Sequence, residues 1–249
     1  MRRIDLNADV GEGFADSDTL LLPLVTSANI ACGGHAGDAS SMAATVALCS
    51  VHGVAIGAHP SYPDREGFGR RELPLDAREL HRALTAQIES LAAIARDAAV
   101  RLGHVKPHGA LYNRAAVDPA VAAIVVNAVR EVDASLLLVG LAGSRLLEAG
   151  RAAGLRVVAE GFADRRYTAE GLLVPRTEPR ALLTDPDDVC SQVRSMVMDR
   201  RVTSLDEVSV PLEIDTVCLH GDGPHAVEFA RLVRGALLGA GVVVGAVQP

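Results

Sequence analysis

Short segments rich in β-branched and other apolar residues alternate with longer Ala- and Leu-rich segments along nearly the whole chain. The longer segments repeat their apolar residues at helical spacing, as Leu80, Leu84 and Ile88 do. Strands that alternate with helices form parallel β–α–β units. Seven such units in 249 residues predict an α/β protein with one (β/α) barrel domain over residues 1–249. An open, doubly wound sheet is the alternative.

The boundaries of these segments follow from periodicity, capping residues and glycines. Asp76 is the expected N-cap of the longest helix, and Gly103 its expected C-terminal glycine. Asp38 is the expected N-cap of an earlier helix. The expected strands are 4–9, 28–32, 54–59, 104–108, 136–141, 157–162 and 217–222. The expected helices are 40–52, 76–102, 118–133, 144–153, 186–200 and 224–239.

Three of the expected strands alternate polar with apolar residues, whereas buried parallel strands are usually continuous apolar runs. The period of two places each polar trio on one face of its strand. In a barrel that face is the lumen, where carboxylates, imidazoles and an ammonium are costly unless they pair or reach water. The trios therefore predict a functional site; they are Asp5, Asn7 and Asp9, then His104, Lys106 and His108, then Cys218, His220 and Asp222.

Composition limits the class of protein. A formal net charge of −7 argues against general nucleic-acid binding, which needs a concentrated positive field. The four cysteines form no CxxC pair, which favours a reducing compartment. With neither a signal peptide nor a membrane-spanning segment in view, we expect a cytoplasmic protein without membrane partners. Among 24 basic residues the only lysine is Lys106.

The first two strands end in glycine-rich segments that carry candidate groups. Asp9 and Glu12 are a candidate base and a ligand-positioning carboxylate, although the glycines around Glu12 also suit a plain tight turn. After the second strand, Gly33 and Gly34 allow close backbone approach to a ligand, and His35 lies where that strand opens. Cys32 is best interpreted as a small buried hydrophobe. The sequence lacks a Walker-type phosphate loop.

Later strand ends add further candidates. His59 precedes a long polar loop whose arginines either clamp a carboxylate or phosphate or are simply solvated. Lys106 is either a fixed positive charge for an oxyanion or phosphoryl group or one partner of a buried ion pair. Glu160 and His220 end strands on the lumen side. Asp222 either faces the site or caps the last helix.

These segments together resemble the LamB/YcsF lactam-utilisation family, also called the 5-oxoprolinase A-subunit family. The resemblance extends from residue 5 to about residue 240, and no motif block is missing. Its blocks are DLNADVGEGF, SANIACGGHAGD, GAHPSYPDREGFGRREL, HVKPHGALYN, AEGFADRRYTAEGLLVPR and CLHGDGPHA.

The resemblance implies a seven-stranded, irregular TIM-like barrel related to the glycoside hydrolase and deacetylase superfamily. It also implies cleavage of the lactam of 5-oxo-L-proline to L-glutamate, coupled to ATP hydrolysis, with partner subunits B and C. The catalytic candidates are then Asp9, His59, Lys106, His108, Glu160 and His220. The substrate-binding candidates are Asn7, Glu12, Asn29, Gly33, Gly34, His35, Arg65, Arg70 and Asp222.

Cofactors and rival functions follow from the same residues. ATP chemistry normally brings Mg²⁺. A tighter metal site is a separate hypothesis, for which fold-level analogy with barrel deacetylases suggests Asp9, His59 and His108. The alternative functions are a metal-dependent deacetylase or amidohydrolase acting alone, and a non-catalytic substrate-binding subunit.

Overall fold

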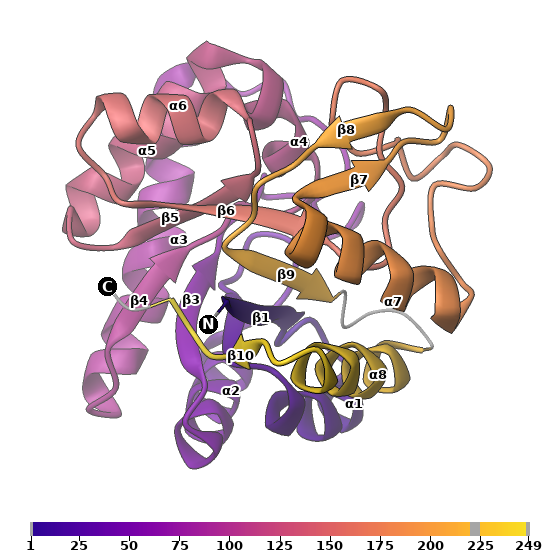
Figure 1. Cartoon of the computed structure of the whole chain (residues 1–249). Helices are drawn as coiled ribbons and strands as arrows, with labels where there is room; N and C mark the ends of the chain where they lie inside the picture. Colours follow the sequence, from indigo (N-terminus) through magenta and orange to yellow (C-terminus); the bar gives the residue numbers. More distant parts are fainter. Residues whose placement is uncertain (1, 220–224, 248–249) are drawn as a thin grey trace.

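Seven parallel strands close into a barrel (Figure 1). The computed structural model describes residues 2–219 and 225–247. The barrel closes where the first strand pairs with the last, as Leu6 lies opposite Val217. Around the barrel the strands are β1 (Arg3–Val10), β2 (Ser27–Ala31), β3 (Ala55–His59), β4 (Leu102–Val105), β5 (Leu137–Leu141), β6 (Val157–Phe162) and β9 (Thr216–Leu219). A short strand, β10 (Val243–Val244), extends the sheet beside the start of β1.

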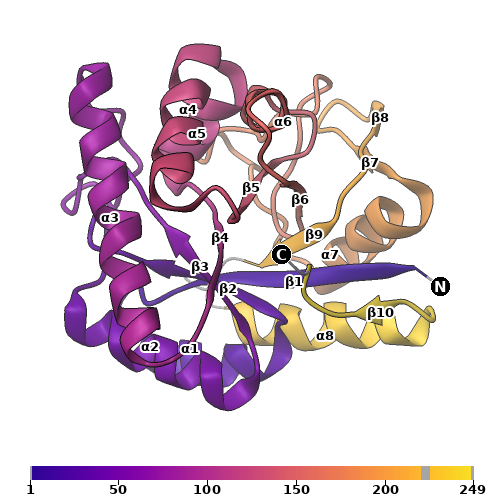
Figure 2. The same cartoon turned by 90° about the vertical axis from the view of Figure 1, so that its left-hand side faces the viewer.

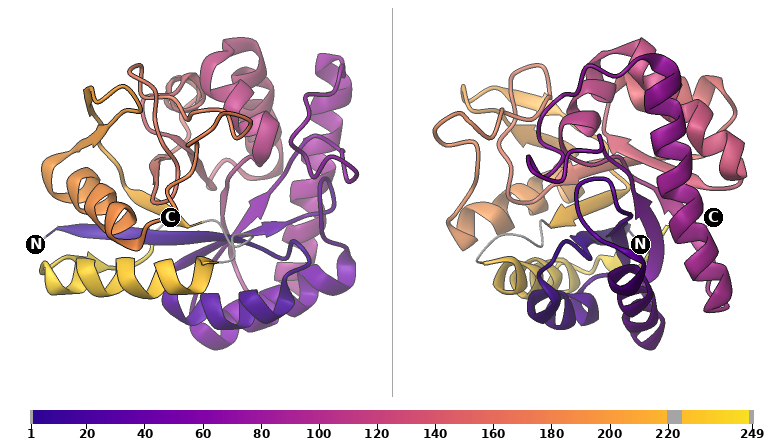
Figure 3. Two further views of the ribbon diagram at one scale, coloured as in Figure 1. Left: turned by 90° about the vertical axis from the view of Figure 1, so that its right-hand side faces the viewer. Right: turned by 180° about the vertical axis from the view of Figure 1, so that it is seen from behind.

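Helices cover the outside of the barrel (Figures 2 and 3). Among the described residues, no helix is long and apolar enough to cross a membrane. The helices are α1 (Ala15–Leu21), α2 (Ala39–His52), α3 (Ala77–Asp97), α4 (Gly109–Val117), α5 (Pro119–Asp133), α6 (Arg145–Ala152), α7 (Pro186–Arg194) and α8 (Ala226–Gly239). A 3-10 turn (Leu22–Leu24) follows α1, and a π-helical segment (Ser195–Asp199) follows α7.

One segment makes the barrel irregular. Between β6 and β9, residues 163–215 form a long loop, then α7, then an antiparallel pair of short strands, β7 (Arg201–Thr203) and β8 (Ser209–Pro211). This insertion lies on one side of the barrel, clear of α3 and α5 (Figure 1). A regular βα unit is thus replaced by a segment that can cover the carboxyl end of the strands.

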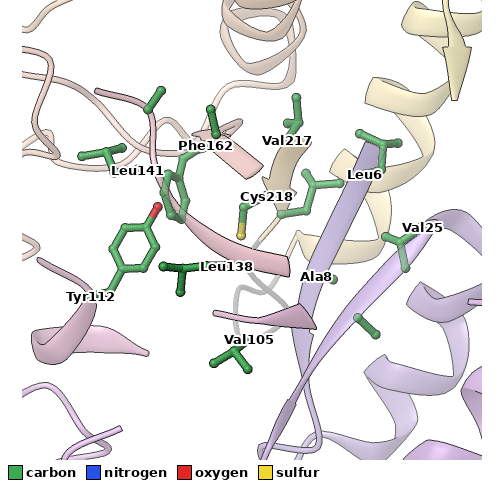
Figure 4. Close-up of a cluster of buried hydrophobic side chains, with 14 of the residues drawn as sticks. Leu6, Ala8, Val25, Val105, Tyr112, Leu138, Leu141, Phe162, Val217 and Cys218 are labelled. Carbon is green, nitrogen blue, oxygen red and sulfur yellow. The ribbon is translucent and has the colours of Figure 1, made fainter. Parts of the chain in front are cut away.

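The apolar core lies between the strands and the helices. Leu6 and Ala8 are fully buried on the outer face of β1, as their alternation with Asp5, Asn7 and Asp9 predicts. Figure 4 shows this packing extending through Val105 and Leu138 to Phe162. A second, small cluster of Leu137, Val139 and Val158 packs with Val247 from the C-terminal segment. These contacts leave the lumen to the polar residues.

The predicted seven-stranded barrel is confirmed, and so are the caps at Asp38 and Asp76, which both form capping boxes. The predicted end of the longest helix is wrong. That helix ends at Asp97, Ala99 takes a left-handed conformation, and Gly103 lies within β4. The apolar spacing misled because Val100 and Leu102 continue it into the next strand.

The predicted strand 104–108 is also displaced, since β4 spans Leu102–Val105. Pro107 has no N–H and interrupts the regular ladder. The backbone nevertheless stays beside β3, because Lys106 N–H donates to the Ala58 carbonyl and His108 N–H to that of Pro60. Helices α1 and α4 and the β7–β8 pair were not predicted. The described part of β9 is Thr216–Leu219, so the positions predicted beyond it, His220 and Asp222, lie outside the described residues.

The lumen leaves no room for a side chain at Gly57 in β3. A Cβ placed there would lie 2.0 Å from Nε2 of His104, whereas one placed at Gly235 in α8 would meet nothing within 4 Å. We therefore expect Gly57→Ala to lower the free energy of unfolding by about 2 kcal/mol or more, through overpacking.

Gly235→Ala is the control, and we expect it to leave stability unchanged or raise it by up to about 1 kcal/mol. Urea unfolding followed by circular dichroism measures both. Equal stability of Gly57→Ala and the unaltered chain would contradict this packing of His104.

Candidate active site

Lys106 crosses the barrel lumen. It follows β4, while its ammonium contacts side chains of β1, β6 and β9 on the opposite wall. Nζ lies 2.9 Å from Oδ1 of Asp9 and 2.8 Å from Oε1 of Glu160. It also lies 3.0 Å from Sγ of Cys218 and 3.3 Å from Oδ1 of Asn7. The interpretation of Lys106 as a partner in a buried ion pair is therefore confirmed, and the pair joins opposite sides of the barrel.

The surroundings keep Lys106 charged. Its side chain is only 2% exposed, and burial acts to lower its pKa. The nearby acidic groups, led by Asp9, outweigh burial and hold the pKa of Lys106 well above its usual value. Burial raises the pKa of the Cys218 thiol well above its usual value, which keeps that sulfur protonated. Lys106 is thus the ammonium of a buried cluster with two carboxylates.

Amide side chains hold this cluster from below. Asn7 donates from Nδ2 to Oε1 of Glu160 (2.9 Å), and Asn29 donates to Oδ1 of Asp9 (2.9 Å). Nε2 of His104 lies 2.8 Å from Oδ1 of Asn29. Burial, followed by the charge of Lys106, lowers the pKa of His104 to about 3, so that His104 is neutral and donates. Asn7 and Asn29 therefore orient the charged groups and do not line the cavity described below.

A deeper layer closes the lumen beneath Asn7. The carboxylate of Asp5 accepts hydrogen bonds from the hydroxyls of Thr26 (2.5 Å), Ser27 (2.7 Å) and Thr216 (2.6 Å). Burial raises the pKa of Asp5 despite these three donors. Asp5 is thus a satisfied internal carboxylate that belongs to the fold.

Above Lys106, three imidazoles and one carboxylate converge at the carboxyl ends of the strands. Oε1 of Glu12 lies 2.9 Å from Nε2 of His35 and 3.4 Å from Nδ1 of His108. Nε2 of His59 lies 3.0 Å from Nδ1 of His108 and 3.4 Å from Oδ2 of Asp9. Burial lowers the pKa of His35 to about 3 and that of His108 well below its usual value. We call Glu12, His35, His59 and His108 the histidine cluster.

The loop after β3 folds down onto this cluster. Phe68 packs edge-on against both His35 and His108, and its carbonyl faces Nε2 of His108 at 3.0 Å. Gly69 has a positive φ and lies so close that a Cβ there would come within 2.8 Å of His35. Asp64 fixes the loop through Arg71 (2.5 Å), which lowers the pKa of Asp64 to about 2. The prediction that this loop covers the barrel mouth agrees with these contacts.

A cavity of about 350 Å³ opens above Lys106. Asp9, Glu12, His59 and His108 lie at its inner end, and three arginines, Arg70, Arg165 and Arg176, also line it. Arg165 is buried, which lowers its pKa to about 10, so it remains charged at neutral pH. Arginine is suited to bidentate recognition of carboxylates and phosphates. The cavity thus combines acid–base groups with an anion-binding wall.

The structure brings most of the predicted site residues together. Asp9, Glu12, His59, Arg70, Lys106 and His108 line the cavity. Glu160, His35, Asn7 and Asn29 are buried immediately around them. Gly33, Gly34 and Arg65 do not line it; Arg65 donates to the carbonyls of Gly33 and Gly37 and so fixes their loop. Cys32 is buried and unpaired, in agreement with its interpretation as a small hydrophobe.

The sequence analysis missed several contributors. Arg165 and Arg176 lie in the insertion after β6, and the only available signal was their place in an arginine-rich motif block. Tyr112 was missed too. Its ring packs edge-on against Phe162 (Figure 4), and burial together with Glu160 raises its pKa well above the usual value. Phe68 and Gly69 act through shape, which residue type alone does not reveal.

The fold and the cavity define a class of protein: a (β/α) barrel with buried acid–base groups at the carboxyl ends of its strands, the usual place for the active site of a barrel enzyme. Residues 4–249 match the LamB/YcsF family, and the chain belongs to that family. A relative from Tolumonas auensis, named as the A subunit of 5-oxoprolinase, is 51% identical over 250 residues, covering 99% of this chain and 100% of the relative.

Solved structures agree with this assignment. A lactam utilization protein from Thermus thermophilus superposes with a TM-score of 0.92 at 43% identity, covering 98% of this chain and 100% of that one. A family 4 carbohydrate esterase from Streptomyces lividans has a TM-score of 0.50 at 12% identity, covering 100% and 94%. The second likeness shows that the fold is shared with a carbohydrate-active enzyme, as expected.

The turn that carries Glu12 depends on a buried carboxyl group. Oδ2 of Asp18 accepts a hydrogen bond from Gly11 N–H at 2.9 Å, and burial raises the pKa of Asp18 to about 6. A raised folded-state pKa stabilises the protein most below the unfolded-state pKa of about 4, and this contribution is lost as the pH rises through about 6.

We therefore expect the unaltered chain to lose stability relative to Asp18→Asn between pH 4 and pH 7. The expected relative change is on the order of 2 kcal/mol, because the amide keeps the acceptor but cannot ionise. Urea unfolding of both proteins at each pH measures the difference. A difference that does not vary with pH would contradict the buried state of Asp18.

Proposed function

We propose that this chain is the lactam-cleaving component of an ATP-dependent 5-oxoprolinase, which converts 5-oxo-L-proline to L-glutamate. The observation that carries the proposal is the cavity, which has a carboxylate and imidazoles at one end and arginines on its wall. A lactam that bears a carboxylate matches both parts. The names of the family relatives support the same activity.

The chemistry explains the need for ATP. A five-membered lactam is a stable amide, so its carbonyl carbon is a poor electrophile. We propose that the lactam oxygen attacks the γ-phosphorus of ATP and that ADP leaves. Water then adds to the activated carbon and gives a proton to a base. The ring C–N bond breaks as the nitrogen takes up a proton.

We assign the proton transfers to groups at the inner end of the cavity. Asp9 is the proposed base towards water, because it lines the cavity and is held by Lys106 and Asn29. His59, 3.4 Å from Asp9, is the proposed partner that passes protons onward. Groups held in position before the reaction need little reorganisation during it.

We assign anion binding to the wall of the cavity. Arg70, Arg165 and Arg176 are the proposed partners of the substrate carboxylate and of the transferred phosphoryl group. Lys106 supplies positive charge close by. Its three N–H groups already face Asp9, Glu160 and Cys218, so its proposed role is mainly to position Asp9.

The assembly and the cofactors belong to the same proposal. The relatives are named as one lettered component of an enzyme, which implies further components, and we propose that these are subunits B and C. Mg²⁺ enters with ATP, since phosphate and carboxylate oxygens are its preferred ligands. All four cysteines are free, which suits the reducing cytoplasm.

A coupled assay with 5-oxoproline, ATP and Mg²⁺ tests the proposal, with ADP and glutamate measured separately. We expect little turnover from this chain alone and full turnover once subunits B and C are added. Turnover by the isolated chain without ATP would instead favour a deacetylase or amidohydrolase. Turnover in the assembly that survives loss of the cavity groups would favour a non-catalytic binding role.

The role of Asp9 gives a sharper prediction. Asp9→Asn keeps the shape of the side chain but removes the base, so glutamate formation in the assembly should fall by on the order of 100-fold or more. Asp16→Asn, the same change at an exposed position in α1, is the control and should leave the rate unchanged. A rate for Asp9→Asn within about threefold of the control would exclude Asp9 as the base.

A further inference from the structure

The histidine cluster has the geometry of a metal site. Each of its four residues offers one ligand atom, and these atoms all lie within 4.8 Å of one another. The contacts among them are 2.9, 3.0, 3.4 and 4.0 Å. Ligands about 2.0–2.1 Å from a tetrahedral zinc ion are about 3.3–3.4 Å apart, so the cluster needs only small adjustments to surround one.

Hydrogen bonds on the outer sides of two rings fix which nitrogens face inward. Nδ1 of His59 lies 2.7 Å from the carbonyl oxygen of Lys106, and Nε2 of His108 lies 3.0 Å from that of Phe68. A carbonyl only accepts, so these two nitrogens carry the protons. Metal-binding histidines almost always donate their other N–H to a backbone carbonyl or a carboxylate in this way.

The inward-facing nitrogens then present a conflict. Nε2 of His59 and Nδ1 of His108 are both lone-pair acceptors in neutral rings, yet they lie 3.0 Å apart. Oε1 of Glu12, a third acceptor, lies 3.4 Å from the same atom of His108. Acceptors that face one another at this distance require a positive species between them. A divalent cation satisfies all of them at once.

The surroundings fit such an ion. All four residues are buried, and Glu12, His59 and His108 also line the cavity, which provides a path of entry. The ring of His35 stacks on that of His108 with centroids 3.7 Å apart, which fixes both orientations. Imidazole and carboxylate ligands suit zinc and similar first-row transition metals.

We propose that Glu12, His35, His59 and His108 bind one divalent transition-metal ion of the zinc class. This set differs from the Asp9, His59 and His108 set suggested by analogy with deacetylases, because Oδ1 of Asp9 is held by Lys106 and Glu12 and His35 lie against the other two imidazoles. The site does not depend on the lactam reaction, and binding by the isolated chain tests it separately.

The experiment uses the full chain after dialysis against a chelator. Zn²⁺ is titrated in competition with a chromophoric chelator, and Co²⁺ is titrated by visible absorption, which reports the ligand geometry. We expect one equivalent of each metal per chain, with Co²⁺ giving the intense visible bands of a site with few ligands. Binding of less than one fifth of an equivalent would show that a shared proton lies between the imidazoles, which overturns the proposal.

Two variants locate the site. Glu12→Gln and His35→Gln should each weaken Zn²⁺ binding by on the order of 100-fold or more, since even outer partners of ligands contribute 10–100-fold. Glu72→Gln is the matched control, because Glu72 lines the same cavity but lies outside the cluster. It should bind as the unaltered chain does, and circular dichroism checks the fold of each variant. Zn²⁺ affinity unchanged in both cluster variants would overturn the proposal.

Discussion

The buried ammonium of Lys106 is the interaction on which the rest of the site depends. An isolated charge in the interior is prohibitively unfavourable, so Lys106 requires both Asp9 and Glu160. Those carboxylates come from β1 and β6, while Lys106 comes from the far side of the barrel. One side chain therefore ties opposite walls together and places Asp9 at the floor of the cavity. The single lysine of the chain lies at the one position where a compact, flexible cation has to span the lumen.

Two layers built on this floor divide the work between them. Below, Asn29 and His104 complete the hydrogen bonds of the charged groups and leave no space for a further side chain, as Gly57 shows. Above, the histidine cluster and the arginines of the later loops face the cavity. Positive and negative groups are thus separated along the cavity, with acid–base groups inside and anion-binding groups on the wall. This arrangement suits a small substrate that carries its own carboxylate.

The sequence predicted the barrel and most of the inner site because both depend on local patterns. The period of two in β1 was enough to place Asp5, Asn7 and Asp9 in the lumen and Leu6 outside. The end of α3 was mispredicted because apolar spacing continues through Val100 and Leu102 into β4. Arg165, Phe68 and Gly69 escaped because loop conformation brings them to the site. The pairing of Lys106 with Glu160 required the closed barrel, since residue spacing does not say which strands face each other.

A double-mutant cycle between Lys106 and Glu160 tests the central claim most directly. The free energy of unfolding is measured in urea for Lys106→Met, Glu160→Gln and the double variant. Lys106→Met leaves two buried carboxylates without their cation and should lose about 3–5 kcal/mol. Adding Glu160→Gln removes one of those charges, so the double variant should be more stable than Lys106→Met alone. Losses that simply add in the double variant would contradict the account.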